Sequence, residues 1–84
     1  MDEREKRYVD VVALTASNGH ITPIEVRWND GRRFHIDKIT EQRHAHSIAV
    51  GGAGICYTIR IGRSQTHLWY DSYRGKWFVE AKRP

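Results

Sequence analysis

The stretch Ile24–Ile36, which reads IEVRWNDGRRFHI, has the alternating hydrophobic and polar pattern of a β-hairpin. Its centre, Asn29–Gly31, suits a three-residue loop that ends in a glycine with left-handed backbone conformation. In that register the large apolar side chains share one face. A two-residue loop would scatter them over both faces, so burial favours the three-residue loop. The predicted pairs are Trp28 with Arg32, Val26 with Phe34, and Ile24 with Ile36.

Further turn signals divide the rest of the chain into short strands. Upstream, Asn18-Gly19 suits a two-residue turn. Downstream, four-residue loops at 62–65 and 72–75 separate three segments of alternating polarity. The upstream turn predicts the pairs Val11/Val26, Val9/Trp28 and Ala13/Ile24. The downstream loops predict the rows Tyr57/Tyr70/Trp77, Ile59/Leu68/Val79 and Ile61/Thr66/Ala81 on one face, and Thr58/Trp69/Phe78, Arg60/His67/Glu80 and Cys56/Asp71/Lys76 on the other.

These segments predict an all-β fold of about six antiparallel strands. Residues 8–83 form one small domain in this interpretation, residues 1–7 a charged N-terminal extension, and residues 40–54 a crossing loop. Each three-stranded meander has one apolar face, and packing the two faces together buries both, as in a small barrel or a two-layer roll. The composition agrees, because 14 residues are Ile or Val and three are Leu or Met, and β-branched side chains suit a pleated surface.

The length and charge of the chain narrow the classes of function. With 84 residues it has room for one small domain, in which a deep substrate cavity is not expected. The single cysteine excludes an intramolecular disulfide and fits a reducing compartment. The charged start, MDEREKR, and the lack of a long apolar run predict a cytoplasmic protein with no membrane partner. Residues 26–84 are basic, with 11 Lys and Arg against five Asp and Glu.

Four motifs within residues 8–82 resemble an uncharacterised bacterial family of small β-domains. They are Pro23-x-x-Val26-x-Trp28-x-x-Gly31-Arg32-x-Phe34-x-Ile36, Tyr57–Ile61 (YTIRI), Leu68–Tyr70 (LWY) and Gly75–Glu80 (GKWFVE). Some members of that family are tails on, or companions to, translesion-type (Y-family) DNA polymerases. Across residues 40–54 the chain departs from the family, which has a Trp-rich segment there. The resemblance implies a small β fold and a connection with nucleic-acid metabolism, and it assigns no catalytic residue.

The clearest binding hypothesis concerns the second face of the downstream meander. There Trp69 and Phe78 would lie side by side, flanked by Arg60, His67 and Lys76. Aromatic platforms edged by basic side chains hold single-stranded nucleic acid on sheets and small barrels. The alternative is that the N-terminal segment, the crossing loop or a second copy of the chain covers the two rings.

A second basic site is predicted at the first hairpin, where Arg27 and Arg33 oppose each other on the face away from the core. Like charges that are directly opposed are unfavourable, so a bound anion such as phosphate would relieve them. Asp10 or Glu25 could neutralise them instead, and arginine side chains extended into solvent are the commonest outcome.

The remaining reactive side chains form no recognisable catalytic or cofactor motif. His44-x-His46 could offer two imidazoles to a metal ion, but exposed loop histidines are the more usual explanation. Cys56 shares its predicted row with Asp71 and Lys76 and has no histidine there, which favours a small apolar residue over a nucleophile. The sequence therefore predicts no enzyme, no metal site and no cofactor.

These patterns predict a non-catalytic binding module, with nucleic acid as the named ligand and an acidic protein surface as the other partner. The alternative function is a protein-interaction or assembly module that buries Trp69 and Phe78 against a partner or against a second subunit of a homodimer. The candidate ligand-binding residues are Arg27, Arg33, Arg60, His67, Trp69, Lys76 and Phe78.

Overall fold

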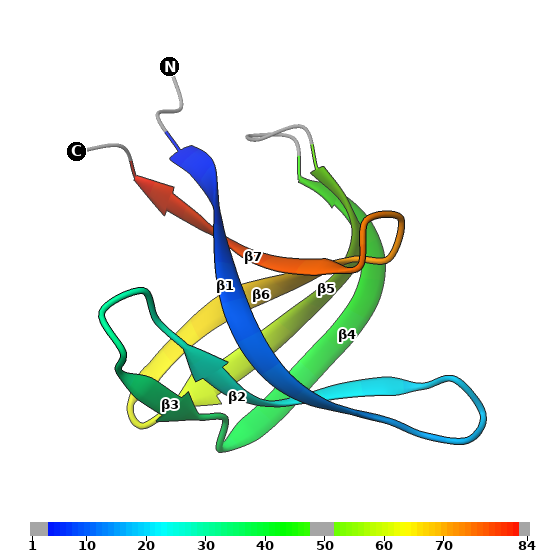
Figure 1. Ribbon diagram of the computed structural model, residues 1–84, viewed down its shortest axis with the longest axis horizontal. Helices are drawn as coiled ribbons and strands as arrows, with labels where there is room; N and C mark the ends of the chain where they lie inside the picture. The colour runs from blue at the N-terminus through cyan, green and yellow to red at the C-terminus, as the bar shows by residue number, and fades with distance from the viewer. Residues whose placement is uncertain (1–3, 48–51, 83–84) are drawn as a thin grey trace.

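Seven antiparallel strands form one sheet in the computed structural model, which describes residues 4–47 and 52–82 (Figure 1). The sheet curls into a half-barrel with the strand order β3-β2-β1-β7-β6-β5-β4. The all-β prediction is confirmed. The described residues form no helix, and so none that is long and apolar enough to cross a membrane. The strands are β1 (Arg4–Thr15), β2 (Ile21–Arg27), β3 (Arg33–His35), β4 (Lys38–Ser47), β5 (Gly52–Ile61), β6 (Ser64–Asp71) and β7 (Lys76–Lys82).

Strand β1 belongs to both halves of the sheet. Its first half, Arg4–Val9, pairs with β7, and its second half, Asp10–Thr15, pairs with β2. The two predicted meanders are therefore joined through β1 into one curled sheet instead of forming separate layers. Residues 4–7, predicted as part of an extension, belong to this strand.

The additional strand occupies much of the region that was predicted as a crossing loop. Lys38–Ser47 forms β4, which pairs with β5 and lies at one edge of the sheet. The described side chains of β4 are exposed apart from Ile39, so the strand lacks the apolar alternation by which a half-buried strand is recognised. Residues 48–51, between β4 and β5, lie outside the described residues.

The predicted β2–β3 hairpin is confirmed in its register. Val26 lies opposite Phe34, and the Trp28 N–H donates a 2.8 Å hydrogen bond to the Arg32 carbonyl. Gly31 closes the three-residue loop with φ of +89°, the conformation that glycine adopts without steric cost.

The β1–β2 hairpin keeps its predicted register near the core and loses it toward the loop. Val11 lies opposite Val26 as predicted, but the pairing shifts between Val12 and Ala13, so Ala13 opposes Pro23 and not Ile24. A β-bulge of this kind leaves one residue of the bulged strand, here β2, without a partner on β1. Ile24 is that residue, and with 38% of its surface exposed it is not the core residue that the sequence predicted.

The β5–β6 register differs from the prediction by two residues. Gly62 and Arg63 form a two-residue turn, for which the φ of +59° at Gly62 is suitable, and Ile61 lies opposite Ser64 instead of Thr66. A shift of two residues keeps every side chain on its predicted face, so the hydrophobic pattern cannot distinguish the two registers.

This shift changes which side chains are neighbours on the second face. Cys56 lies opposite Trp69, so the predicted row of Cys56 with Asp71 and Lys76 is wrong. The β6–β7 register is confirmed, since Trp69 lies opposite Phe78 and Asp71 opposite Lys76.

The main core lies on the concave face of the half-barrel. Trp28 packs half-buried against it, so the first hairpin covers the downstream strands as predicted. The hydroxyl of Tyr57 donates a 2.6 Å hydrogen bond to the Ile21 carbonyl, which satisfies the polar end of a fully buried ring. The buried residues are Val9, Val26, Ile36, Tyr57, Ile59, Leu68 and Trp77.

Asp71 organises the turn between β6 and β7. Its buried carboxylate accepts hydrogen bonds from the N–H groups of Tyr73 and Arg74 and from the Arg74 guanidinium, at 3.0, 3.1 and 2.9 Å. Burial by itself would raise the pKa of this carboxyl, but the three hydrogen bonds favour the charged form and bring the pKa below its ordinary value of 3.8.

We expect Asp71 to make the fold sensitive to acid. A carboxylate whose pKa is lower in the folded chain stabilises the fold above its unfolded pKa of 3.8 and loses that contribution as the pH falls through the folded pKa. Urea unfolding at a series of pH values should show the free energy of unfolding decreasing below about pH 4, and Asp71→Asn should flatten this decrease. Asp10→Asn removes an exposed carboxylate and is the control; an equal effect of both substitutions would contradict the prediction.

Gly54 lies at a close approach of β5 to the backbone of β6. Its φ is +151°, and a Cβ atom at this position would overlap the carbonyl oxygen of Tyr70. Gly54→Ala should therefore lower the free energy of unfolding by about 2–4 kcal/mol, measured by urea denaturation. Gly19→Ala is the matched control. Gly19 has φ of +90°, and a Cβ atom there would meet no other atom, so the alanine variant should lose only about 1 kcal/mol from backbone strain. Equal losses in the two variants would show that the close approach has no consequence.

Candidate functional site

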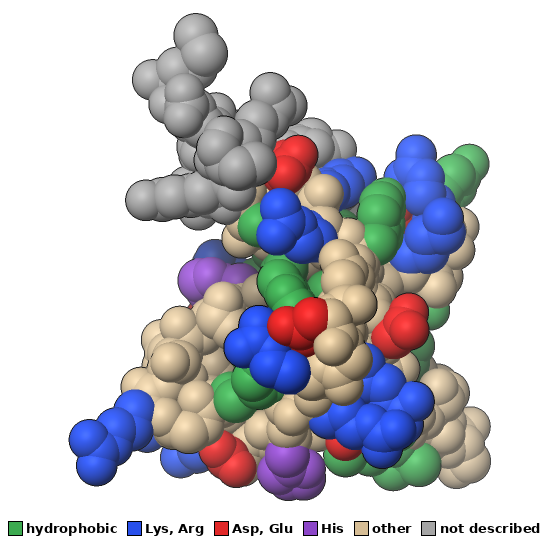
Figure 2. Space-filling view, turned by 60° about the vertical axis from the view of Figure 1, so that its left-hand side comes forward, with side chains coloured by type: hydrophobic (Ala, Val, Ile, Leu, Met, Phe, Trp, Pro, Cys, Tyr) green, Lys and Arg blue, Asp and Glu red, His purple; other side chains and the backbone are tan. Residues whose placement is uncertain are grey.

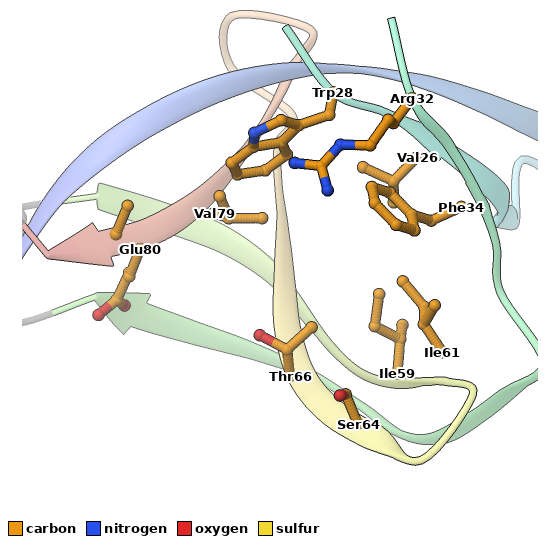
Figure 3. Close-up of a pocket in the computed structure, with 11 residues that line it drawn as sticks. Val26, Trp28, Arg32, Phe34, Ile59, Ile61, Ser64, Thr66, Val79 and Glu80 are labelled. Carbon is orange, nitrogen blue, oxygen red and sulfur yellow. The ribbon is translucent and has the colours of Figure 1, made fainter. Parts of the chain in front are cut away.

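A groove opens on the concave face where the β2–β3 hairpin faces β5, β6 and β7 (Figure 3). Its volume is about 520 Å³, within the range of small-ligand sites. The hollow is an open groove, and side chains from β2, β3, β5, β6 and β7 surround it. The lining is mostly apolar and consists of Val26, Trp28, Arg32, Phe34, Ile59, Ile61, Ser64, Thr66, Val79, Glu80 and Ala81.

One wall of the groove is the β2–β3 hairpin. Trp28 and Phe34 lie half-buried on its inner face, because they follow the alternation that starts at the buried Val26. The guanidinium of Arg32 points into the groove between the two rings and lies 5.5 Å from the centre of the Phe34 ring (Figure 3). A 2.6 Å ion pair from its Nε to Asp30 orients the guanidinium.

The opposite wall comes from β5 and β6. Ile59 and Ile61 alternate inward along β5, and Thr66 and Ser64 supply two hydroxyl groups from β6 (Figure 3). An apolar floor, two flat rings and one cation are suited to a flat, apolar group that carries a negative charge at its edge.

Basic side chains surround this end of the half-barrel. Lys38 lies opposite Arg60 at the start of β4, and Arg63 occupies the turn next to Ser64, which lines the groove. Arg33 follows Arg32 on the hairpin. Lys and Arg side chains cover more of the surface than Asp and Glu on the face seen in Figure 2. Lys38 and Arg60 point to the face away from the groove, because they alternate with Ile39, Ile59 and Ile61.

The predicted opposition of Arg27 and Arg33 is present, but it is already neutralised in part. The two residues are paired across β2 and β3. Arg27 Nε makes a 2.9 Å ion pair with Glu25, which is one of the two carboxylates that the sequence offered as an alternative to a bound anion. Arg33 is exposed and makes no ion pair with a described side chain.

The predicted platform of Trp69 and Phe78 is not an open surface. The rings stack at 5.8 Å with an angle of 5°, but only 6% of Trp69 and none of Phe78 is exposed. Tyr8 packs edge-on against Phe78, and the Lys6 ammonium lies 5.1 Å above the same ring, so β1 supplies the cover. Covering by the N-terminal segment was the alternative explanation, and it removes these two rings from any surface for bases or for a partner.

The other predicted residues of that face are not brought together. His67 is exposed opposite Thr58, and Arg60 lies opposite Lys38 and Gln65, near the groove. Lys76 is at the other end of the sheet, with its ammonium 5.2 Å from the centre of the Tyr8 ring. None of these residues lines the groove, and Arg60, between Ile59 and Ile61 on β5, points to the opposite face.

Neither a thiol nucleophile nor a metal site is supported by the described side chains. Burial raises the pKa of the Cys56 thiol above its ordinary value of 9.0, so the thiol stays protonated at neutral pH. No group of three His, Cys, Asp or Glu residues is placed to hold a metal ion within the described part of the chain. The side chain of His46 lies outside that part.

The residues that the sequence-based interpretation missed are Trp28, Arg32 and Phe34. The hydrophobic pattern placed the two rings correctly on the inner face but implied that they were fully covered. Their position next to the turn of the hairpin, with an arginine directly opposite Trp28, was the available signal, because a core position opposite a cation is only partly covered.

Comparison of this chain with protein-family models, with curated proteins and with solved structures gave no match. The resemblance to the bacterial family of small β-domains therefore stays a prediction. The candidate site depends on its own geometry: half-buried Trp28 and Phe34 with the Arg32 guanidinium between them, above an apolar floor and beside exposed cations.

Proposed function

We propose that this protein is a non-catalytic binding module that holds single-stranded nucleic acid in the groove on its concave face. The observation that carries the proposal is the arrangement of Arg32 between Trp28 and Phe34. An unpaired base is a flat, apolar group with a phosphate attached, and it matches both the rings and the cation.

Stacking is the first source of affinity. An aromatic side chain contributes about 1–3 kcal/mol per base, and an arginine plane adds a cation–π contribution. A groove of about 520 Å³ is large enough for a base, whereas a base inside a duplex cannot reach its recessed rings. The site therefore favours single strands over duplexes.

The charge around the groove is the second source. Arg32 lines the groove, Arg63 occupies the turn next to it, and the chain has a net charge of +4. Neutralising phosphates releases counterions, so the affinity should fall as the salt concentration rises.

Titration of a labelled oligothymidylate by fluorescence anisotropy tests the proposal. Trp28→Ala and Arg32→Gln should each weaken binding by about tenfold, because one removes a stacking ring and the other a cation in the groove. Lys76→Gln removes the same charge as Arg32→Gln from the opposite end of the sheet, and it should change the affinity by less than about twofold. The affinity of the unmodified protein should fall steeply between low and high salt.

Two outcomes would contradict the groove as the nucleic-acid site. One is an affinity that does not depend on salt. The other is a loss in Lys76→Gln as large as that in Arg32→Gln, which would mean that only the total charge matters. Circular dichroism of Trp28→Ala establishes whether the fold is retained, and Arg32→Gln, which removes no core side chain, keeps the test independent of that result.

A further inference from the structure

The second half of β1 has a free edge. Strand β7 begins at Lys76, and its pairing with β1 ends at Val9 opposite Trp77. Beyond this point, among the described strands, Asp10–Thr15 pairs only with β2. Figure 1 shows this half of β1 leaving β7 and continuing with β2 as a projecting arm. An edge strand of this kind is a template for an added strand.

The same half of β1 carries an exposed apolar stripe. Val12 and Leu14 are exposed, and Leu14 retains 59% of its surface. Because successive residues of a strand point to opposite faces, these even-numbered positions share one face. A free edge beside an apolar stripe offers both backbone hydrogen bonds and side-chain burial to an extended segment.

A hollow lies where the two strands diverge. It has a volume of about 520 Å³, and its lining combines β1 residues with Gly75, Lys76 and Trp77 from the start of β7. The turn at residues 72–75 blocks the path beside β1 that β7 would follow if it were longer. A strand added to the free edge must therefore end in this hollow.

We propose that the free edge of β1 binds the C-terminal segment of a partner protein as an added antiparallel strand. All strand pairs of this sheet are antiparallel, and antiparallel pairing is the more stable kind. An antiparallel segment beside Asp10–Thr15 runs from Thr15 toward Asp10, so its last residue reaches the hollow. There its terminal carboxylate reaches the exposed ammonium of Lys76, which shares the hollow with the side chain of Asp10.

The geometry also defines the side chains of this partner. Alternate residues of the added strand lie on the face of Val12 and Leu14, and apolar side chains at these positions cover the exposed stripe. The surface is separate from the groove of the proposed nucleic-acid site, since the two hollows share no lining residue.

The probe is a fluorescein-labelled peptide of alternating threonine and valine, with either a free C-terminal carboxylate or a C-terminal amide. The carboxylate form should bind about tenfold more tightly than the amide, because it keeps one charge-assisted contact with Lys76. Lys76→Gln should abolish this difference without unfolding the chain, since Lys76 is exposed. Leu14→Ser should weaken both peptides, and Tyr73→Ser, which alters an exposed turn residue, should weaken neither.

N-methylation of the peptide tests the added strand without changing the protein. Only every second N–H of an added strand faces the neighbouring strand. Methylation of one alternate set of amides should therefore abolish binding, and methylation of the other set should leave it nearly unchanged. A peptide held by apolar contacts alone would respond equally to both.

Several results would overturn the proposal. They are equal binding of the carboxylate and the amide, equal effects of the two methylation sets, and no binding at about 1 mM peptide. A preference for a free N-terminus that is lost in Asp10→Asn would reverse the direction of the strand. A concentration-dependent dimer in light scattering that Leu14→Ser abolishes would assign the edge to a second copy of this chain.

Discussion

The pairing of β1 with two different neighbours is the constraint on which the rest of the structure depends. A strand of 12 residues joins β7 along its first half and β2 along its second, so the β2–β3 hairpin is carried over the concave face of β5–β7. This brings Val26 against Ile59 and Trp77 in one core. The same strand places Tyr8 and Lys6 over Phe78 on the other face. One strand therefore closes both faces of a sheet that is too small to have a second layer.

Both open hollows follow from this change of neighbour. β7 and the β2–β3 hairpin lie on opposite sides of β1 and diverge from each other. Their side chains face each other across the groove, which Trp28 lines from the hairpin and Val79 from β7. Where β1 leaves β7, the second hollow opens beside Trp77. A closed barrel of this length would need its large apolar side chains for the interior. A half-barrel leaves some of them half-buried, and these are the side chains that can contact a ligand.

The parts that could be predicted from the sequence are those in which turn chemistry and burial agree. Asn29–Gly31 and the opposed Val26 and Phe34 fixed one register, and the structure has it. The β5–β6 register could not be decided, because a shift of two residues buries the same face. β4 was missed because an exposed edge strand has no apolar period. The charged segment Arg4–Val9 covers Phe78. Its pairing with β7 joins the strands that are farthest apart in the sequence, and the hydrophobic pattern gives no sign of it.

The aromatic residues show why the predicted platform of Trp69 and Phe78 is covered while other rings remain half-buried. Trp69 and Phe78 lie on β6 and β7, which each have a paired strand on both sides, and their stacked rings form a second small core with Cys56. Trp28 lies just beyond the end of β2, where pairing ceases and cover is partial. Composition and periodicity identify both sets as apolar, but the cover that paired neighbouring strands supply decides whether the face of a ring remains accessible. In a small half-barrel, rings at strand ends are therefore the better candidates for stacking on a ligand.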